Sequence, residues 1–245
     1  MKKIFLNCDL GGENFGLYQI GNDEAIVPLA DAVNIACGFH AGDPPQSMNK
    51  TVQLAKKHHV KIGAHPGFPD LQGFGRRKID MLPADVYDAI IYQLGALSGF
   101  TTAHSIKLHH VKPHGALYNM ACKDEKLADA IAKAVIDFDK NLILVGLANS
   151  KLVEAGKAYG LAVANEVFAD RTYQSDGSLT PRSLDNAVIH DKDQVIRQVE
   201  EMINHQLVTT VTGEKIEIKA DTICVHGDTV EALELVKAIR KLITH

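Results

Sequence analysis

The stretch DEKLADAIAKAVIDFDKNLILVG, residues 124–146, predicts a helix followed by a strand, a pair that recurs along the chain. Asp124 suits the N-cap of a helix, and apolar residues follow it at helical spacing from Leu127 to Phe138. Leu142–Gly146 is apolar throughout rather than alternating, which favours a strand covered on both faces in a parallel sheet. This stretch therefore indicates an α/β fold.

Six further runs of apolar or β-branched residues, each bounded by Gly, Pro, Asn or Asp, are typical of strands. They are Lys3–Cys8, Val33–Cys37, Val60–Ala64, Lys107–Lys112, Ala162–Phe168 and Thr222–His226. Amphipathic segments with helical period lie between these runs. Pro83, Asn149 and Thr229 are start signals for such helices, and Gly160 is a stop signal.

Leu207–Ile218, centred on Gly213, breaks the alternation and predicts a small β-hairpin inserted before the last strand. Because no linker, low-complexity tract or fixed-period repeat divides the chain, we expect one domain over residues 1–245. About seven parallel strands joined by helices form either an open doubly wound sheet or a closed (β/α) barrel. The pattern alone leaves both arrangements open.

The composition argues against several classes of protein. The 245 residues carry a formal net charge of −4 without a run of basic residues, so we expect no nucleic-acid and no membrane partner. The longest apolar stretch, Leu142–Ala148, is too short to span a bilayer, and MKKIFLNCDL lacks the apolar region of a secretory signal. The four cysteines form no CxxC pair and fit reduced thiols, so we expect a cytoplasmic protein.

Ionisable side chains follow nearly every expected strand, beside Gly or Pro residues that turn the chain. In a parallel sheet these strand ends share one edge, and in a barrel they surround one mouth, where active sites form. We therefore expect a catalytic site there. Its candidate residues, taken strand by strand, are Asn7, Asp9, His40, Asp43, His65, Lys112, His114, Asp170, Arg171, His226 and Asp228.

Three kinds of chemistry could use this set. A divalent metal would find imidazole and carboxylate ligands at the strand ends, although no HExxH-like spacing supports it. The residues with suitable atoms are Asp9, His40, His65, His114, His226 and Asp228. General acid–base catalysis would suit a pair such as His226 and Asp228, because the carboxylate fixes the tautomer of the imidazole. The third kind of chemistry is binding of an anionic substrate or transition state. The sequence does not decide among the three.

Fixed positive charge for an anionic substrate is available from Lys112, Arg171, Arg182 and the pair Arg76–Arg77. The sequence contains neither a complete GxGxxG nor a GxxxxGK[ST] motif, so it does not predict a Rossmann or P-loop phosphate site. The cysteines within the expected strands are interpreted as small buried side chains rather than as catalytic thiols.

Strings around these residues closely resemble those of the LamB/YcsF family, in order over nearly the whole chain. They are Asn7–Gly11 (NCDLG), Asn34–Asp43 (NIACGFHAGD), Gly63–Pro66 (GAHP), His110–Asn119 (HVKPHGALYN), Glu166–Arg171 (EVFADR) and His226–Asp228 (HGD). The resemblance implies a (β/α) barrel of the glycoside hydrolase/deacetylase type. It also implies ATP-dependent opening of the 5-oxoproline (pyroglutamate) lactam to L-glutamate, carried out with two partner subunits of a 5-oxoprolinase, B and C.

Under this resemblance ATP is a co-substrate, with Mg²⁺ as its companion, because phosphorylation of the amide oxygen would activate a resonance-stabilised lactam. The residues expected in catalysis are Asp9, His65, Lys112, His114, His226 and Asp228. Those expected to bind substrate are Asn7, His40, Asp43, Arg76, Asp170 and Arg171. Lys112 and Arg171 would hold the substrate carboxylate or the phosphorylated oxygen. Asp9 or His226 would activate water, and a histidine would protonate the leaving nitrogen.

Two other functions stay open. The chain could be a stand-alone metal-dependent amidohydrolase or deacetylase, with its divalent metal at Asp9, His40 and His65. It could instead be a non-catalytic subunit whose barrel mouth presents substrate to a partner. A homo-oligomer is equally open, because the sequence does not determine the oligomeric state.

Overall fold

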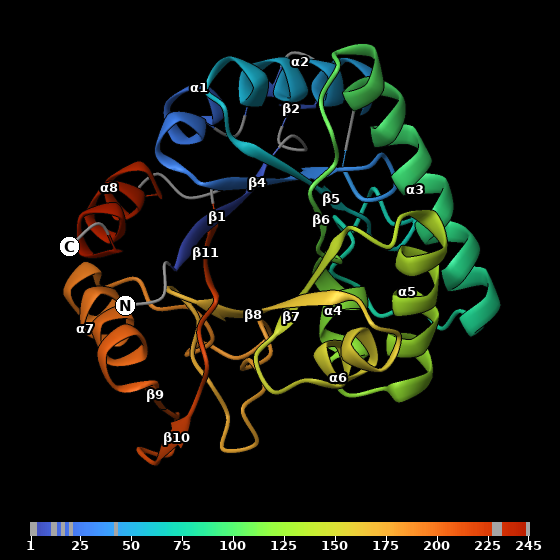
Figure 1. Cartoon of the computed structure of the whole chain (residues 1–245). Coiled ribbons are helices and arrows are strands. Elements are labelled where there is room, and N and C mark those ends of the chain that lie inside the picture. Colours follow the sequence, from blue (N-terminus) through green and yellow to red (C-terminus); the bar gives the residue numbers. More distant parts are fainter. Residues whose placement is uncertain are drawn as a thin grey trace.

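A closed barrel of seven parallel strands forms the centre of the molecule, with helices around its outside (Figure 1). The computed structural model describes residues 4–10, 14–15, 18–19, 22–41, 44–226 and 232–243. In the order in which they pair around the barrel, the strands are β1 (Phe5–Leu10), β11 (Thr222–His226), β8 (Ala162–Phe168), β7 (Ile143–Leu147), β6 (His110–Val111), β5 (Lys61–His65) and β4 (Ala32–Ala36). The closed arrangement implied by the family resemblance is confirmed.

Helices connect successive strands and cover the outer face of the barrel (Figure 1). Those within the described residues are α1 (Asp23–Ile26), the short 3-10 helix η1 (Val27–Leu29), α2 (Pro44–Lys57), α3 (Pro83–Ala103), α4 (Gly115–Ala121), α5 (Glu125–Phe138), α6 (Lys151–Ala158), α7 (Lys192–His205) and α8 (Ala232–Ile243). On α3, Val86, Ile90, Leu94 and Leu97 repeat at helical spacing and are all buried. Amphipathic patterning therefore sets which face of each helix meets the barrel.

The expected helix ends are partly right. Pro83 begins α3, and the side chain of Asp124 accepts hydrogen bonds from two backbone N–H groups at the start of α5. Asn149 was expected to cap α6, and this is wrong. Asn149 takes a left-handed φ of 63°, and the Ser150 hydroxyl accepts from the backbone N–H of Val153 instead. Thr229 lies outside the described residues.

The predicted hairpin is confirmed as an antiparallel pair, β9 (Leu207–Thr209) with β10 (Lys215–Glu217), joined through Gly213. A second short pair that the sequence did not predict, β2 (Asn14–Phe15) with β3 (Tyr18–Gln19), follows β1. Strand β6 is shorter than the predicted run of residues 107–112. Its hydrogen bonding continues on both sides nevertheless, because the N–H groups of His109 and Lys112 donate to β5.

The interior of the barrel is unusually polar for a protein core. Side chains alternate along a strand, so Leu6 and Cys8 of β1 face the helices while Asn7 and Asp9 face the barrel axis. The four cysteines are buried free thiols, as predicted. Within the described part of the chain, no helix combines the length and apolar character that crossing a bilayer requires.

Candidate active site

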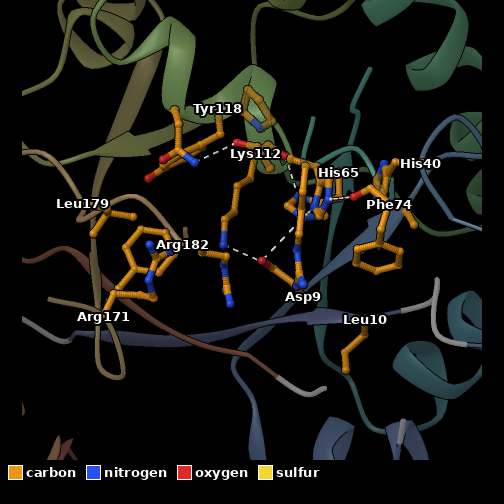
Figure 2. Close-up of a pocket in the computed structure, with 17 residues that line it drawn as sticks. Asp9, Leu10, His40, His65, Phe74, Lys112, Tyr118, Arg171, Leu179 and Arg182 are labelled. Carbon is orange, nitrogen blue, oxygen red and sulfur yellow. Dashed lines mark hydrogen bonds and ion pairs between the residues drawn. The ribbon is translucent and has the colours of Figure 1, made fainter. Parts of the chain in front are cut away.

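A pocket of about 70 Å³ opens at the carboxyl ends of the strands, several times the space that one water molecule needs (Figure 2). Seven of the twelve residues expected in catalysis or substrate binding line it together. They are Asp9 on β1, His40 after β4, His65 on β5, Arg76 between β5 and α3, Lys112 and His114 after β6, and Arg171 after β8. Residues from position 9 to position 171 therefore meet at one mouth.

Two selected residues lie elsewhere. Asn7 is two residues below Asp9 on β1 and is buried in the barrel, where its amide contacts Thr222 and Asn34 rather than the pocket. Asp170 is buried beside Arg171 but is absent from the pocket lining. Neither residue lines this pocket, so the expected substrate contact of both residues stays a prediction.

Three further selected residues fall partly or wholly outside the described residues. Asp43 and Asp228 lie outside them, so their expected roles stay predictions. His226 is the last residue of β11, and its backbone pairs with that of Asp9. This register brings position 226 to the mouth, although its side chain is outside the described part of the structure.

Lys112 is the charged centre of the pocket floor, with only 2% of its side chain exposed. Its ammonium donates a 2.8 Å hydrogen bond to Asp9 Oδ1 and contacts Glu166 Oε1 at 2.8 Å. The second contact is an ion pair without the alignment of a hydrogen bond, since Glu166 Oε1 accepts none. Burial alone would lower the pKa of Lys112, but the neighbouring Asp9, Cys224 and Glu166 outweigh it and hold this pKa well above its usual value.

Glu166 and Tyr118 are site residues that sequence reasoning missed. Glu166 is fully buried on β8, where Oε2 accepts a 2.8 Å hydrogen bond from the Tyr118 hydroxyl. Tyr118 lines the pocket from α4. The sequence does carry a signal for Glu166, which is an acidic residue within a largely apolar strand. A buried carboxylate requires a partner of opposite charge, so such a residue predicts a cation nearby.

His40 and His65 lie on one side of the pocket (Figure 2), and His114 packs against both of them. The rings of His40 and His114 are stacked with centroids 3.8 Å apart. Burial first, and then the neighbouring imidazoles, lower the pKa of His40 and of His114 well below the usual value. Nitrogen atoms of the three rings lie within 4.8 Å of one another, so this group could hold a metal ion.

A tight loop covers these histidines. Gly75 has a left-handed φ of 64°, and a Cβ there would lie 2.7 Å from His40 Cβ and 2.8 Å from His114 Cδ2. Asp70 anchors the loop, because its carboxylate accepts from the N–H of Gly73 and pairs with Arg77. The same loop brings Phe74 and Arg76 into the pocket wall.

Arginines occupy the opposite side of Lys112 from the histidines (Figure 2). Arg171 is buried and held in place, because Nε donates to the carbonyl of Ala187 and Nη2 to the carbonyl of Thr180. Burial, followed by the charge of nearby Arg182, lowers the pKa of Arg171 to about 10. Arg76, which enters from the loop over the histidines, adds a third positive charge to the pocket lining, so the pocket is suited to an anion.

Comparisons with known proteins agree with this architecture. The model of the LamB/YcsF family matches residues 4–245. The chain belongs to this family. It is 55% identical over 240 residues to the A subunit of 5-oxoprolinase from Tolumonas auensis, covering 98% of this chain and 95% of that one. It is 56% identical over 241 residues to the same subunit from Bacillus subtilis, covering 98% and 93%.

A solved structure supports the fold independently. The lactam utilization protein from Thermus thermophilus superposes with a TM-score of 0.91 at 43% identity. The match covers 100% of this chain and 96% of that one. The LamB/YcsF resemblance drawn from the strand-end motifs is thus confirmed, together with the barrel.

Proposed function

We propose that this chain is the lactam-opening component of an ATP-dependent 5-oxoprolinase, which converts 5-oxoproline to L-glutamate. The observation that carries the proposal is a pocket with an oriented carboxylate, Asp9, between a group of histidines and a wall of arginines. A small substrate with one amide and one carboxylate fits this pocket, with the carboxylate toward the arginines and the amide toward Asp9 and the histidines. The names of the relatives, the A subunit of 5-oxoprolinase and the lactam utilization protein, support the same reaction.

The arginine wall is the proposed subsite for the substrate carboxylate. Arg171 is held rigidly by two backbone carbonyls, and its charge is not paired through those contacts, since carbonyls are neutral. Arg182 lines the pocket with Arg171, and Arg76 adds positive charge from the loop over the histidines. An anionic ligand would relieve the repulsion among these guanidinium groups and gain bidentate hydrogen bonds.

The family resemblance suggested that Lys112 holds the substrate carboxylate or the phosphorylated oxygen. We propose a different role for it. Its ammonium lies between the carboxylates of Asp9 and Glu166, so the local charge of the three groups is negative and repels an anion. We therefore assign the carboxylate to the arginines. Lys112 fixes Asp9 instead, and Arg171 keeps the anion-binding part expected of it.

Asp9 is the proposed general base. Its Oδ1 accepts hydrogen bonds from Lys112 and from Asn34 Nδ2, each at 2.8 Å. These bonds orient the carboxylate and leave Oδ2 on the side of His65, whose Nε2 lies 3.4 Å away. A water beside Oδ2 could lose its proton to Asp9 while attacking the lactam carbon. A histidine of the pocket would then protonate the leaving nitrogen. His226 and Asp228 stay proposed participants at the same mouth.

ATP explains how a stable amide is opened. The lactam oxygen would take the terminal phosphoryl group of Mg·ATP, which releases ADP and makes the ring carbon electrophilic. Water then adds to that carbon, and the C–N bond breaks as a proton goes to the nitrogen, which leaves an acyl phosphate. A second water hydrolyses the acyl phosphate and releases phosphate and the new carboxylate of glutamate. The sequence has no P-loop motif, so we place the nucleotide chemistry with the partner subunits B and C or at an interface with them.

The test is release of glutamate from 5-oxoproline, measured for the chain alone and for the chain with its partner subunits, with and without ATP. We expect release only when the partners and ATP are both present. No glutamate from a properly folded complex would contradict the proposal.

A second function, a stand-alone metal-dependent amidohydrolase or deacetylase, is favoured by the histidine group. Opening of the lactam or removal of acetyl groups by the isolated chain without ATP would support this alternative instead.

A further inference from the structure

The outer nitrogens of two pocket histidines are held by backbone carbonyls. His65 Nδ1 lies 2.7 Å from the carbonyl oxygen of Lys112, and His114 Nε2 lies 2.7 Å from the carbonyl oxygen of Phe74. Because a carbonyl oxygen only accepts hydrogen bonds, each of these ring nitrogens carries a proton. The other nitrogen of each ring is then the one that can offer a lone pair to a metal ion.

Those two lone pairs face each other. His65 Nε2 and His114 Nδ1 are 2.9 Å apart, and Asp9 Oδ2 lies 3.4 Å from His65 Nε2. Two nitrogen lone pairs and a carboxylate oxygen at these distances repel one another unless a cation lies among them. In metal sites of proteins, a ligating histidine usually donates its other ring N–H to a carbonyl or carboxylate, which fixes the orientation of the ring. His65 and His114 have this arrangement.

His40 supports this pair of histidines from the side. Its side chain is 1% exposed, and its Nδ1 has no hydrogen-bond partner within the described residues. Its ring stacks on His114, and the loop at Gly75 packs against both rings. The site is therefore rigid before any ligand arrives, which lowers the cost of binding.

We propose that His65 Nε2 and His114 Nδ1 bind one divalent transition-metal ion beside the Asp9 carboxylate, which stays available as the base. His40 stacks on His114 and holds its ring in place. Imidazole suits Zn²⁺ and its first-row neighbours, whereas Mg²⁺ prefers oxygen ligands and bound water. His65 and His114 are both among the candidate ligands that the sequence offers, and the contact of His114 Nε2 with a carbonyl leaves Nδ1 to face His65. The site is distinct from the Mg²⁺ that would accompany ATP.

The use of such an ion rests on the proposed function, but its binding does not. When bound there, a divalent cation would act as a Lewis acid for a carbonyl or phosphoryl oxygen of the substrate. The residues of the chain hold the ligands in place, and Lys112 serves twice, through its side chain on Asp9 and its carbonyl on His65.

The experiment titrates Co²⁺, as a coloured probe, into the full chain after removal of metals with a chelator. Calorimetry should show one Co²⁺ per chain, with visible absorption bands of a nitrogen- and oxygen-ligated ion and a rise in the thermal unfolding midpoint. His114→Gln should weaken binding at least about tenfold, the lower end of the loss seen even for residues one step removed from a metal. His104→Gln is the matched control, because His104 bonds Asn49 away from the pocket.

Absence of saturable one-to-one binding would overturn the proposal, as would equal Co²⁺ affinity of the wild type and a folded His114→Gln variant. Nitrogen-15 NMR of the metal-free protein gives a second readout. Two protonated nitrogens on His65 that persist when Co²⁺ is added would show that a proton occupies the place of the metal. Co²⁺ binding without any turnover of 5-oxoproline would uphold the site and contradict only the proposed function.

Discussion

At the scale of single residues, the site depends on one buried ammonium among carboxylates. Lys112 contacts Asp9 and Glu166 at 2.8 Å and has Cys224 Sγ at 3.1 Å. A buried ion pair adds little to stability by itself, but removal of one partner leaves an uncompensated charge in a medium that solvates it poorly. The free energy of unfolding should therefore respond strongly to changes at Lys112.

Lys112→Met should lower the free energy of unfolding by about 3–5 kcal/mol, the usual cost of breaking a buried pair from one side. Urea unfolding at pH 7 measures this loss. Lys126→Met is the control, because Lys126 is exposed at the start of α5 and its loss should change stability by no more than about 0.5 kcal/mol. If Lys112→Met lowers the free energy of unfolding by less than about 1 kcal/mol, the buried carboxylates of Asp9 and Glu166 do not depend on the Lys112 charge.

Residue types at strand ends were predictable, and their buried partners were less so. Asp9, His65 and Lys112 lie near Gly or Pro residues at strand ends, where ionisable side chains indicate an active site. Glu166 lies within a strand, and only the fold shows that it faces Lys112 and Tyr118. Pairing across the barrel depends on strand order, which a single sequence does not display.

At the scale of elements, side chains from neighbouring strands form a directed chain of hydrogen bonds inside the barrel. Asn34 Nδ2 donates to Asn7 and to Asp9, so Asn34 Oδ1 must accept from His110 Nε2, 2.7 Å away. His110 is therefore neutral with its proton on Nε2. Burial first, and then nearby cationic groups, lower the pKa of His110 well below 6.5.

His110 should make stability depend on pH in a defined window. The unfolded chain binds the imidazole proton below about pH 6.5 and the folded chain does not, so stability is fully present above that pH and falls below it. The contribution is about 1.4 kcal/mol per pH unit. Urea unfolding between pH 5 and 7 should show a slope smaller by this amount in His110→Gln. Equal slopes in the two proteins would contradict the assignment.

Strand β5 has a glycine where the ring of His110 comes closest. A Cβ at Gly63 would lie 2.1 Å from His110 Nε2, so Gly63→Ala should cost at least about 1–3 kcal/mol of stability through overpacking. The cost should shrink in a His110→Ala background, which a double-mutant cycle measures. Gly95→Ala on α3 is the control, because nothing lies within 4 Å of its added Cβ. Additive effects at positions 63 and 110 would contradict the proposed contact.

At the scale of the whole molecule, the first and last strands are neighbours. Strand β1 pairs with β11 on one side and with β4 on the other, so the ends of the chain close the barrel together (Figure 1). Ile223, Cys224 and Val225 of β11 are fully buried. The barrel without this strand would have two open edges and a breached core.

A chain that ends at Ala220, before β11, should therefore lose cooperative unfolding altogether. Thermal unfolding followed by near-ultraviolet circular dichroism is the measurement, with the full chain as reference. A cooperative transition in the shortened chain would show that the barrel is stable without closure.

Sequence patterns predicted the seven strands, most helix faces and the hairpin, because burial on both faces and amphipathic spacing are local signals. Closure was not a local signal, since parallel strands joined by helices also build open sheets. The family resemblance supplied that step. Asn7 and Asp170 are buried and do not line the pocket. The spacing of residues in the sequence does not show how deep in the barrel a side chain lies.

Asp9 carries the central claim, and its replacement tests that claim most directly. The measurement is ATP-dependent glutamate release from 5-oxoproline by the complex of this chain with its partner subunits. Asp9→Asn should slow release by at least about 100-fold, the range for loss of a general base, with complex assembly unchanged. The exposed-site control Asp80→Asn should keep wild-type rates. Release by a folded Asp9→Asn complex at the wild-type rate would contradict the account and leave this chain with a binding role only.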